Sequence, residues 1–221
     1  MTATTPDAAA ARPGAGWIER FTPATRALHW ATATLVLVCA LTGFSLYVGS
    51  VSAIVGHREV VRTVHVTAGL LIPVPLVLAY LGPWRRGVRA EFRRLGRWSR
   101  DDRRWLRSRG REARDQVGKY NAGQKANAAF IAGMIPLMLV SGSVMKWFHY
   151  FPLRYRTGAT FVHDWTAIVA WAVIAGHILF ALNDTGSLRG MVTGRVSRAW
   201  AALHHPRWAG EVVEEADSPL R

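Results

Sequence analysis

The chain has 221 residues with a formal net charge of +14 at pH 7, and half of its residues are hydrophobic. The hydrophobic residues are gathered into long blocks rather than spread evenly, which is typical of a membrane protein and argues against an ordinary soluble domain. A single cysteine, Cys39, excludes an intrachain disulfide and any metal site built from several cysteines.

Residues 1–19 precede the first apolar block, and we expect them to form a disordered N-terminal tail. Their first sixteen residues lack a basic segment followed by an apolar core, so they do not resemble a secretory signal.

Four apolar windows follow, each long enough to cross a hydrocarbon core that needs about 20 helical residues. The windows cover approximately residues 28–48, 61–82, 126–147 and 161–183. We therefore predict an all-α membrane protein with a four-helix transmembrane bundle over residues 20–196. Residues 197–221 are expected to form a C-terminal tail.

The predicted connection between the second and third spans, residues 83–120, is strongly basic. Within it, residues 85–114 contain 13 Arg and 4 acidic residues. Such a balance could indicate nucleic-acid binding, but its place between two apolar spans favours a cytoplasmic loop that contacts anionic lipid headgroups. The opposite connections, residues 49–60 and 148–160, together hold three Arg. We therefore expect this loop and both termini to be cytoplasmic, and we expect no nucleic-acid partner.

Four histidines fall inside the predicted spans, at two depths. His65 follows the start of the second span and His163 the start of the fourth, so both lie near the outer face; we call them the outer pair. His29 opens the first span and His177 lies in the last third of the fourth, near the cytoplasmic face; we call them the inner pair. Fourteen residues advance a helix by about 1400°, roughly 40° short of four turns, so His163 and His177 share one helix face.

Two imidazoles that face each other across a bundle could hold zinc, copper or a haem iron. Zinc usually has three or four protein ligands, and among carboxylates and thiols only Asp164 lies at a matching depth. A bis-histidine haem needs two protein ligands for its iron and space for a flat macrocycle, which three nearby glycines could provide: Gly43, Gly69 and Gly176. The alternative is that the histidines pack or relay protons, but four histidines paired by depth favour haem.

The other histidines lie outside the spans, where contact with solvent or a partner is the expected role: His57, His149, His204 and His205. We expect none of them to bind a metal. Arg26 precedes His29 by three residues, so its guanidinium could pair with a haem propionate or anchor the helix among lipid headgroups.

A resemblance to a known family rests on five segments. They are "RALHW" around His29, "HVTAGL" from His65, "VGKYNAGQK" at 117–125, "VHDWTAIVAWAVIAGH" at 162–177 and "GSLRGMVTGRVSRAWAALHHPRW" at 186–208. From about Arg20 to Trp208, the chain resembles the gamma subunit of membrane-bound respiratory formate dehydrogenase, a dihaem cytochrome b. The "KYNAGQK" and "HHPRW" motifs are the discriminating parts, because histidines in helices occur in many cytochromes b. The chain departs from the family in its more Arg-rich loop and longer N-terminal tail.

The resemblance implies two haem b groups. The outer haem would be held by His65 and His163 and the inner haem by His29 and His177, which are the pairs that depth predicts. These four histidines are therefore the predicted ligands of the two haem irons.

The resemblance also implies a menaquinone site beside the inner haem, at Asn121, Gly123 and Gln124. These residues precede the third span and are expected at the depth of the inner pair, where amide side chains could hydrogen-bond a quinone carbonyl. The alternative is a plain helix start with Asn121 as the N-cap.

The function implied is that of a multi-pass anchor in the bacterial cytoplasmic membrane. Electrons from an iron–sulfur beta subunit, which accompanies a molybdenum or tungsten catalytic alpha subunit, would pass through two haems to menaquinone or another quinone. Formate oxidation itself would take place on the partner chain. Two alternatives remain open: the cytochrome b of a hydrogenase or thiosulfate reductase, and a non-redox membrane scaffold.

Overall fold

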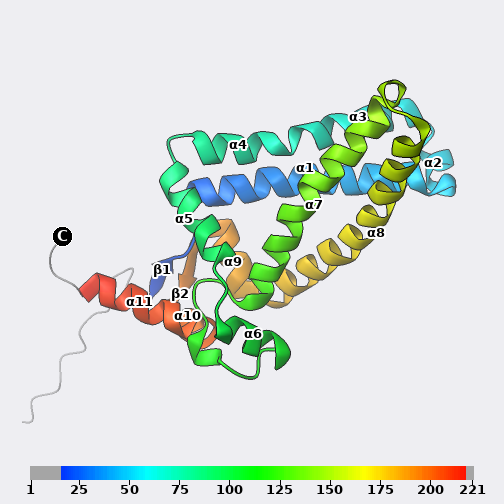
Figure 1. Ribbon diagram of the computed structural model, residues 1–221. Coiled ribbons are helices and arrows are strands. Elements are labelled where there is room, and N and C mark those ends of the chain that lie inside the picture. The colour runs from blue at the N-terminus through cyan, green and yellow to red at the C-terminus, as the bar shows by residue number, and fades with distance from the viewer. Residues whose placement is uncertain (1–15, 218–221) are drawn as a thin grey trace, which may run out of the picture.

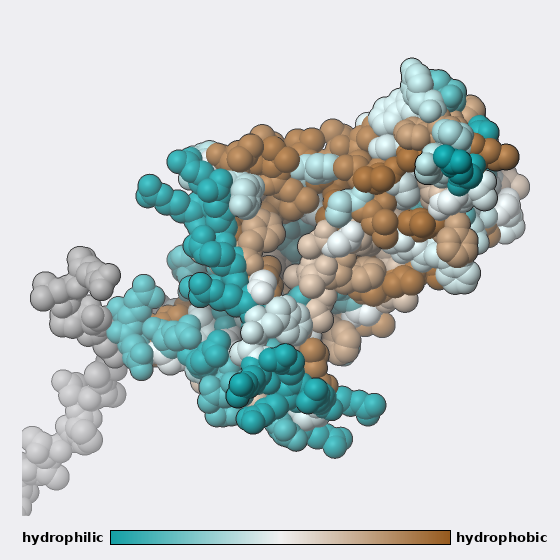
Figure 2. Space-filling model, viewed as in Figure 1, coloured by the Kyte–Doolittle hydropathy of each residue, from teal (hydrophilic) through white to brown (hydrophobic). Residues whose placement is uncertain are grey.

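The computed structural model describes residues 16–217, which form mainly long helices (Figure 1). Among these residues, four helices are long and apolar enough to cross a membrane, as predicted. The spans are α1 (Pro23–Tyr47), α3 with α4 (Arg58–Leu71 and Pro73–Leu81), α7 (Ala122–Lys146) and α8 (Leu153–Asn183). On the face seen in Figure 2, apolar residues cover the middle of the bundle and hydrophilic residues gather at both ends. The predicted all-α membrane bundle is confirmed.

The second span is interrupted rather than continuous. Helix α3 ends at Leu71 and α4 begins at Pro73. Proline has no N–H to donate to the preceding turn, and its ring crowds the carbonyl four residues earlier. Ile72 between them keeps right-handed helical dihedral angles, so α4 continues the course of α3 (Figure 1).

We call one end of the bundle the hairpin end, because it joins the spans in pairs. It holds the short helix α2 (Gly49–Val55) between α1 and α3, and the 3-10 turn η2 (Phe148–Tyr150) between α7 and α8. Helix α1 packs against α3, and α7 packs against α8. The bundle is therefore two antiparallel helix pairs side by side (Figure 1).

The opposite end, the loop end, is also folded. Its elements are α5 (Arg85–Gly96), α6 (Arg100–Arg107), η1 (Arg114–Gln116), α9 (Thr185–Thr193), α10 (Arg198–His204), α11 (Pro206–Asp217) and the strands β1 (Trp17–Glu19) and β2 (Arg195–Ser197). Ser99 and Asp102 form a reciprocal capping box at the start of α6. Lys125 on α7 is buried and contacts Asp102 at 2.8 Å, which attaches α6 to the bundle.

Both predicted tails contain ordered structure. Strand β1 pairs antiparallel with β2, with Ile18 opposite Val196. Helices α10 and α11 continue from β2, and Ala201 and Trp208 join the two strand residues in a buried apolar cluster. Residues 17–19, which were expected within a disordered tail, thus form a strand, and the expected C-terminal tail contains two helices, Arg198–His204 and Pro206–Asp217. Residues 1–15 and 218–221 lie outside the described part of the chain.

His205 is buried, contrary to the solvent or partner contact expected from its position. Its Nδ1 donates to the carbonyl oxygen of Gly118 at 2.7 Å, and its Nε2 accepts from Arg20 Nη2 at 3.0 Å. Arg20 is 2% exposed and also donates to the carbonyl oxygen of Lys119 at 3.1 Å. These contacts join the N-terminal strand, the segment before α7 and the C-terminal helices.

Lowering the pH is expected to destabilise these contacts of His205. Burial is the larger cause and the charge of Arg20 the second, and together they lower the pKa of His205 to about 3. The pKa of a histidine in an unfolded chain is about 6.5. Because the unfolded segment binds a proton more readily, the contribution of His205 to the free energy of unfolding is fully present above about pH 6.5. This contribution is lost as the pH falls towards 3. Protease cleavage within residues 195–217 should increase between pH 7.5 and pH 5. His205→Asn, which cannot take up that proton, should lose this dependence; equal pH dependence in both proteins would contradict the assignment.

Candidate functional site

The structure brings the four histidines of the spans together in the two pairs expected from depth. His65 on α3 faces His163 on α8, with ring centroids 6.2 Å apart and planes at 73°. His29 on α1 faces His177 on α8, again with centroids 6.2 Å apart and planes at 57°. Helix α8 therefore contributes one imidazole to each of two sites at different depths.

The donor set and spacing of each pair fit a haem iron. Two imidazoles that bind one metal at about 2 Å have ring centres roughly 6 Å apart, close to the observed 6.2 Å. Within residues 16–217, no three His, Cys, Asp or Glu side chains are grouped to hold a metal ion. A site with two protein ligands suits a metal whose macrocycle supplies the remaining ligands, whereas zinc usually takes three or four from the protein.

Two glycines lie directly against the outer pair. A Cβ on Gly43 would be 3.2 Å from Cε1 of His65, and a Cβ on Gly142 would be 3.2 Å from Cε1 of His163. Gly43 was expected from the sequence, but Gly142 was not. The signal that could have identified it is a repeated pair of a hydroxyl residue and glycine, "TG" at 42–43 and "SG" at 141–142.

The other two glycines proposed from the sequence do not contact a histidine. Gly69 lies against Cys39, whose Sγ would be 3.8 Å from an added Cβ, and Gly176 has open space around it. Gly176 adjoins His177, which is exposed, so this part of the inner pair is not enclosed by protein.

Arg26 contacts the end of α9 in the structure. Its Nε donates to the carbonyl oxygen of Met191 at 3.3 Å, and its Nη2 donates to the carbonyl oxygen of Val192. Trp30 donates to the same Met191 oxygen at 3.2 Å. Both side chains therefore attach α1 to the last turn of α9, where carbonyl groups lack partners within the helix.

The three residues predicted to bind quinone lie at the start of α7, with Asn121 as its N-cap and Gly123 and Gln124 in its first turn. The Asn121 side chain accepts from the Gln124 backbone N–H at 2.8 Å, and the Gln124 side chain accepts from the Asn121 backbone N–H at 3.1 Å. This is a reciprocal capping box, so the N-cap interpretation of Asn121 is correct. The cap uses only the side-chain oxygens, and both amide NH₂ groups can still donate.

An aromatic side chain lies beside this turn, and the register of α7 against α8 gives the depth of the turn in the bundle. A Cβ on Gly123 would be 3.6 Å from the ring of Trp105 and 3.3 Å from Asn121 Oδ1. Helices α7 and α8 are antiparallel, and Ser141 contacts His163. His177 is fourteen residues beyond His163, so it lies level with residue 127 on α7. Gln124 is then within about one helical turn of the depth of the inner pair.

A network of charged and phenolic groups precedes the turn. Glu91 on α5 accepts from Lys119 Nζ at 2.5 Å and from Tyr120 Oη at 2.6 Å. Burial lowers the pKa of Lys119, and burial together with Glu91 raises the pKa of Tyr120. Burial alone would raise the pKa of Asp102, but hydrogen bonds from Lys125 and Ser99 outweigh it and lower that pKa.

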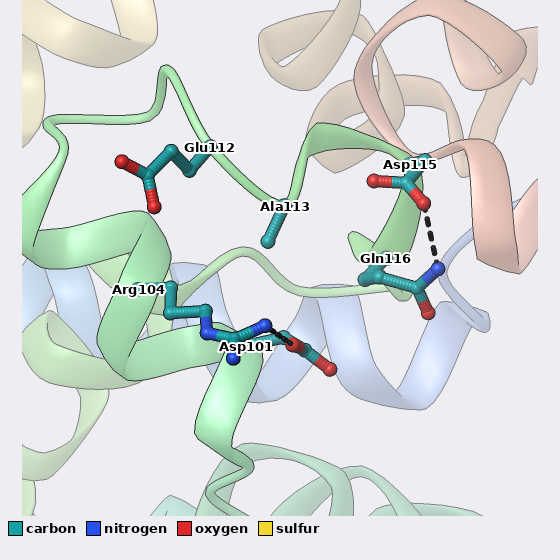
Figure 3. A pocket seen from close by; sticks show the side chains of 6 residues that line it. All are labelled: Asp101, Arg104, Glu112, Ala113, Asp115 and Gln116. Atoms are coloured by element: carbon teal, nitrogen blue, oxygen red, sulfur yellow. Dashed lines mark hydrogen bonds and ion pairs between the residues drawn. The ribbon is translucent and has the colours of Figure 1, made fainter.

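A polar surface pocket lies in the Arg-rich segment (Figure 3). It is lined by Asp101, Arg104, Glu112, Ala113, Asp115 and Gln116. Two of its carboxylates already have partners, since Asp101 lies 3.8 Å from Arg104 and Asp115 accepts from Gln116 at 2.7 Å. These polar side chains therefore pair with one another within the segment, and none of the four span histidines lines the pocket.

The sequence of the chain is similar to those of known membrane cytochromes b. Residues 20–194 match the family of prokaryotic cytochrome b561. The chain is 30% identical over 203 residues to the cytochrome b556(Fdn) subunit of nitrate-inducible formate dehydrogenase from Escherichia coli (strain K12), covering 87% of this chain and 90% of that protein. It is 30% identical over 204 residues to the E. coli cytochrome b556(fdo) subunit, covering 88% and 93%. It is 29% identical over 202 residues to the formate dehydrogenase cytochrome b556 subunit of Haemophilus influenzae, covering 89% and 83%.

Proposed function

The chain belongs to the prokaryotic cytochrome b561 family of membrane cytochromes b, and on that premise we propose that it is the dihaem membrane subunit of a formate dehydrogenase that reduces a quinone. The observation that carries this proposal is the pair of facing imidazoles at each of two depths, both 6.2 Å apart. A non-redox scaffold is inconsistent with the family, and the relatives named above are all formate dehydrogenase subunits.

Each histidine pair has a distinct role in this proposal. His65 and His163 would hold the outer haem, and His29 and His177 would hold the inner haem. When bound, each haem supplies a one-electron carrier, and two carriers at different depths allow electrons to cross the membrane. The four histidines position these carriers along α8, fourteen residues or roughly 21 Å of helix apart.

The first turn of α7 would bind the quinone on the loop-end side of the inner pair. The amide NH₂ groups of Asn121 and Gln124 would donate to a quinone carbonyl while their oxygens cap the helix. A Cβ at Gly123 would lie against Asn121 Oδ1 and the Trp105 ring, so glycine keeps the space between them free of a side chain. We place menaquinone or a related quinone here because its two carbonyl oxygens accept hydrogen bonds.

Isosteric acids separate the quinone contact from the helix cap. Asn121→Asp and Gln124→Glu keep the oxygen that accepts the capping hydrogen bond but remove the NH₂ donor. Loss of one hydrogen bond costs about 0.5–1.5 kcal/mol, so quinone or inhibitor affinity should fall roughly three- to tenfold. Both haems should stay bound and reducible by the donor, while quinol formation slows.

The matched control is Asn183→Asp, which changes an exposed amide near the same end of the bundle. It should leave quinone reduction unchanged. If Asn121→Asp and Gln124→Glu also reduce quinone at the wild-type rate with unchanged inhibitor sensitivity, the quinone binds elsewhere and this turn is only a helix cap. Gly123→Val is less informative, because its side chain would also displace the capping oxygen of Asn121.

The loop end would face the cytoplasm of a bacterial cell, and the hairpin end would face the iron–sulfur subunit that accompanies the molybdenum or tungsten catalytic subunit. The charge distribution supports this orientation, since residues 85–114 hold 13 Arg and such an excess stays on the cytoplasmic side. Reporter fusions after Arg114 and after Arg221 should be active only for a cytoplasmic reporter. A periplasmic signal from either fusion would reverse the assignment.

A further inference from the structure

The two histidines of the outer pair are held in the same way by different helices. Thr42 Oγ1 on α1 lies 3.0 Å from His65 Nδ1. Ser141 Oγ on α7 lies 3.0 Å from His163 Nδ1. In both cases the next residue is the glycine that lies against the ring. The same local arrangement therefore occurs once in each helix pair of the bundle.

The direction of these hydrogen bonds follows from the other partners of the hydroxyls. Thr42 Oγ1 donates to the carbonyl oxygen of Val38 at 2.6 Å, and Ser141 Oγ donates to the carbonyl oxygen of Leu137 at 2.7 Å. A hydroxyl has one hydrogen, so towards the histidine each oxygen acts as an acceptor. Each Nδ1 must then carry a hydrogen.

A backbone carbonyl supports the same tautomer for His65. The oxygen of Cys39 lies 3.1 Å from His65 Nδ1, and a carbonyl oxygen can only accept. With Nδ1 protonated in a neutral imidazole, Nε2 has the free lone pair that binds a metal. The surroundings of the outer pair therefore select the tautomer that a haem iron requires.

The inner pair is not held in this way. Across residues 16–217, no hydrogen bond of the structure includes a ring nitrogen of His29 or His177. The His29 ring has an aromatic edge contact with Trp30, with centroids 5.3 Å apart. A ring that donates its second N–H to an acceptor is a more basic ligand than one that does not, so the two pairs differ as electron donors to a metal.

We propose that Thr42 and Ser141 are positioning residues that fix the outer histidines and make the outer haem the one with the lower reduction potential. This inference rests on the proposed dihaem function. A more basic imidazole stabilises the oxidised iron relative to the reduced iron, and hydrogen bonding to the ligands is one of the ways in which a protein sets haem potential. With both haems bound, this order would favour passage of an electron from the site held by His65 and His163 to the site held by His29 and His177.

The test is a redox titration of the full-length haem-loaded protein, followed by visible spectra. The two components are assigned first with His163→Ala, which should remove the outer one. In the wild type the outer component should have the lower midpoint potential. Thr42→Val and Ser141→Ala should each raise it, by up to roughly tenfold in the reduction equilibrium constant, or about 59 mV for one electron. The inner component should not move.

Conservative exchanges and a matched control complete the design. Thr42→Ser and Ser141→Thr keep the hydroxyl and should retain the wild-type potential. Thr34→Val makes the same change at an exposed position of α1 and should have no effect. If Thr42→Val or Ser141→Ala loses the outer haem while the hydroxyl-keeping variants retain it, the positioning role is equally supported.

Two results would overturn the inference without affecting the proposed function. One is a pair of unchanged potentials in Thr42→Val and Ser141→Ala with two haems bound. The other is a wild-type outer component that titrates above the inner one. A wild-type protein that binds fewer than two haems would instead refute the proposed function itself.

Discussion

Replacing His65 or His163 with alanine is expected to remove the outer haem and leave the spectrum of the inner haem in place. His29→Ala or His177→Ala should do the reverse. The reason is that each iron would have two protein ligands, and the two pairs lie at different depths of the bundle. Loss of one imidazole would leave only one histidine to hold that haem. Reduced-minus-oxidised spectra of each purified variant would measure the component that is lost.

Comparing the His163→Ala and His177→Ala variants, which change the same helix, is the control for misfolding. His163 and His177 both lie on α8, so a general failure of this helix would remove both components from either variant. Circular dichroism should show wild-type helix content in all four proteins. If His65→Ala and His29→Ala lose the same spectral component while remaining folded, the pairing is wrong.

Valine at Gly43 or Gly142 is expected to weaken binding of the outer haem while both histidines remain. An added Cβ already lies 3.2 Å from the imidazole Cε1 at each position, and a branched side chain would push the ring from its place. Overpacking of this kind typically costs about 1–3 kcal/mol, which is a loss of roughly 5- to 150-fold in haem affinity. Alanine should have a smaller effect in the same direction. Haem titration of the purified apoprotein would measure the affinity.

Gly158→Val provides the matched control, because no atom lies within 4 Å of the position of its Cβ. This residue is on α8, five residues before His163, and so faces about 140° away from it. It should bind both haems normally. Outer-haem affinity that is unchanged in Gly43→Val and Gly142→Val would show that the outer ring positions differ from those in the structure.

The histidine pairs could be predicted from the sequence because two simple rules sufficed. The charge of the Arg-rich segment predicts the direction of each span, and helical geometry places His163 and His177 on one face. Depth alone then selects His65 and His29 as partners. No knowledge of helix packing was needed for this step.

The residues that contact the histidine pairs could not be predicted from the sequence, because their contacts depend on how the helices pack. Thr42 and Ser141 are recognisable as partners of His65 and His163 only when the register of α1 against α3 and of α7 against α8 is known. The folded loop end was missed for another reason. Its strands have three residues each, too few to show an alternating pattern, and their pairing joins segments far apart in the chain. The burial of His205 depends on that pairing.

The haem content of the purified full-length chain tests the central claim most directly. The account predicts two non-covalently bound b haems per polypeptide, one for each pair of imidazoles 6.2 Å apart. A pyridine haemochrome assay, with protein measured by amino-acid analysis, gives this ratio. A value of two, with both haems extractable by acidic acetone, is the predicted result; a value of one or zero in folded protein saturated with haem would contradict it.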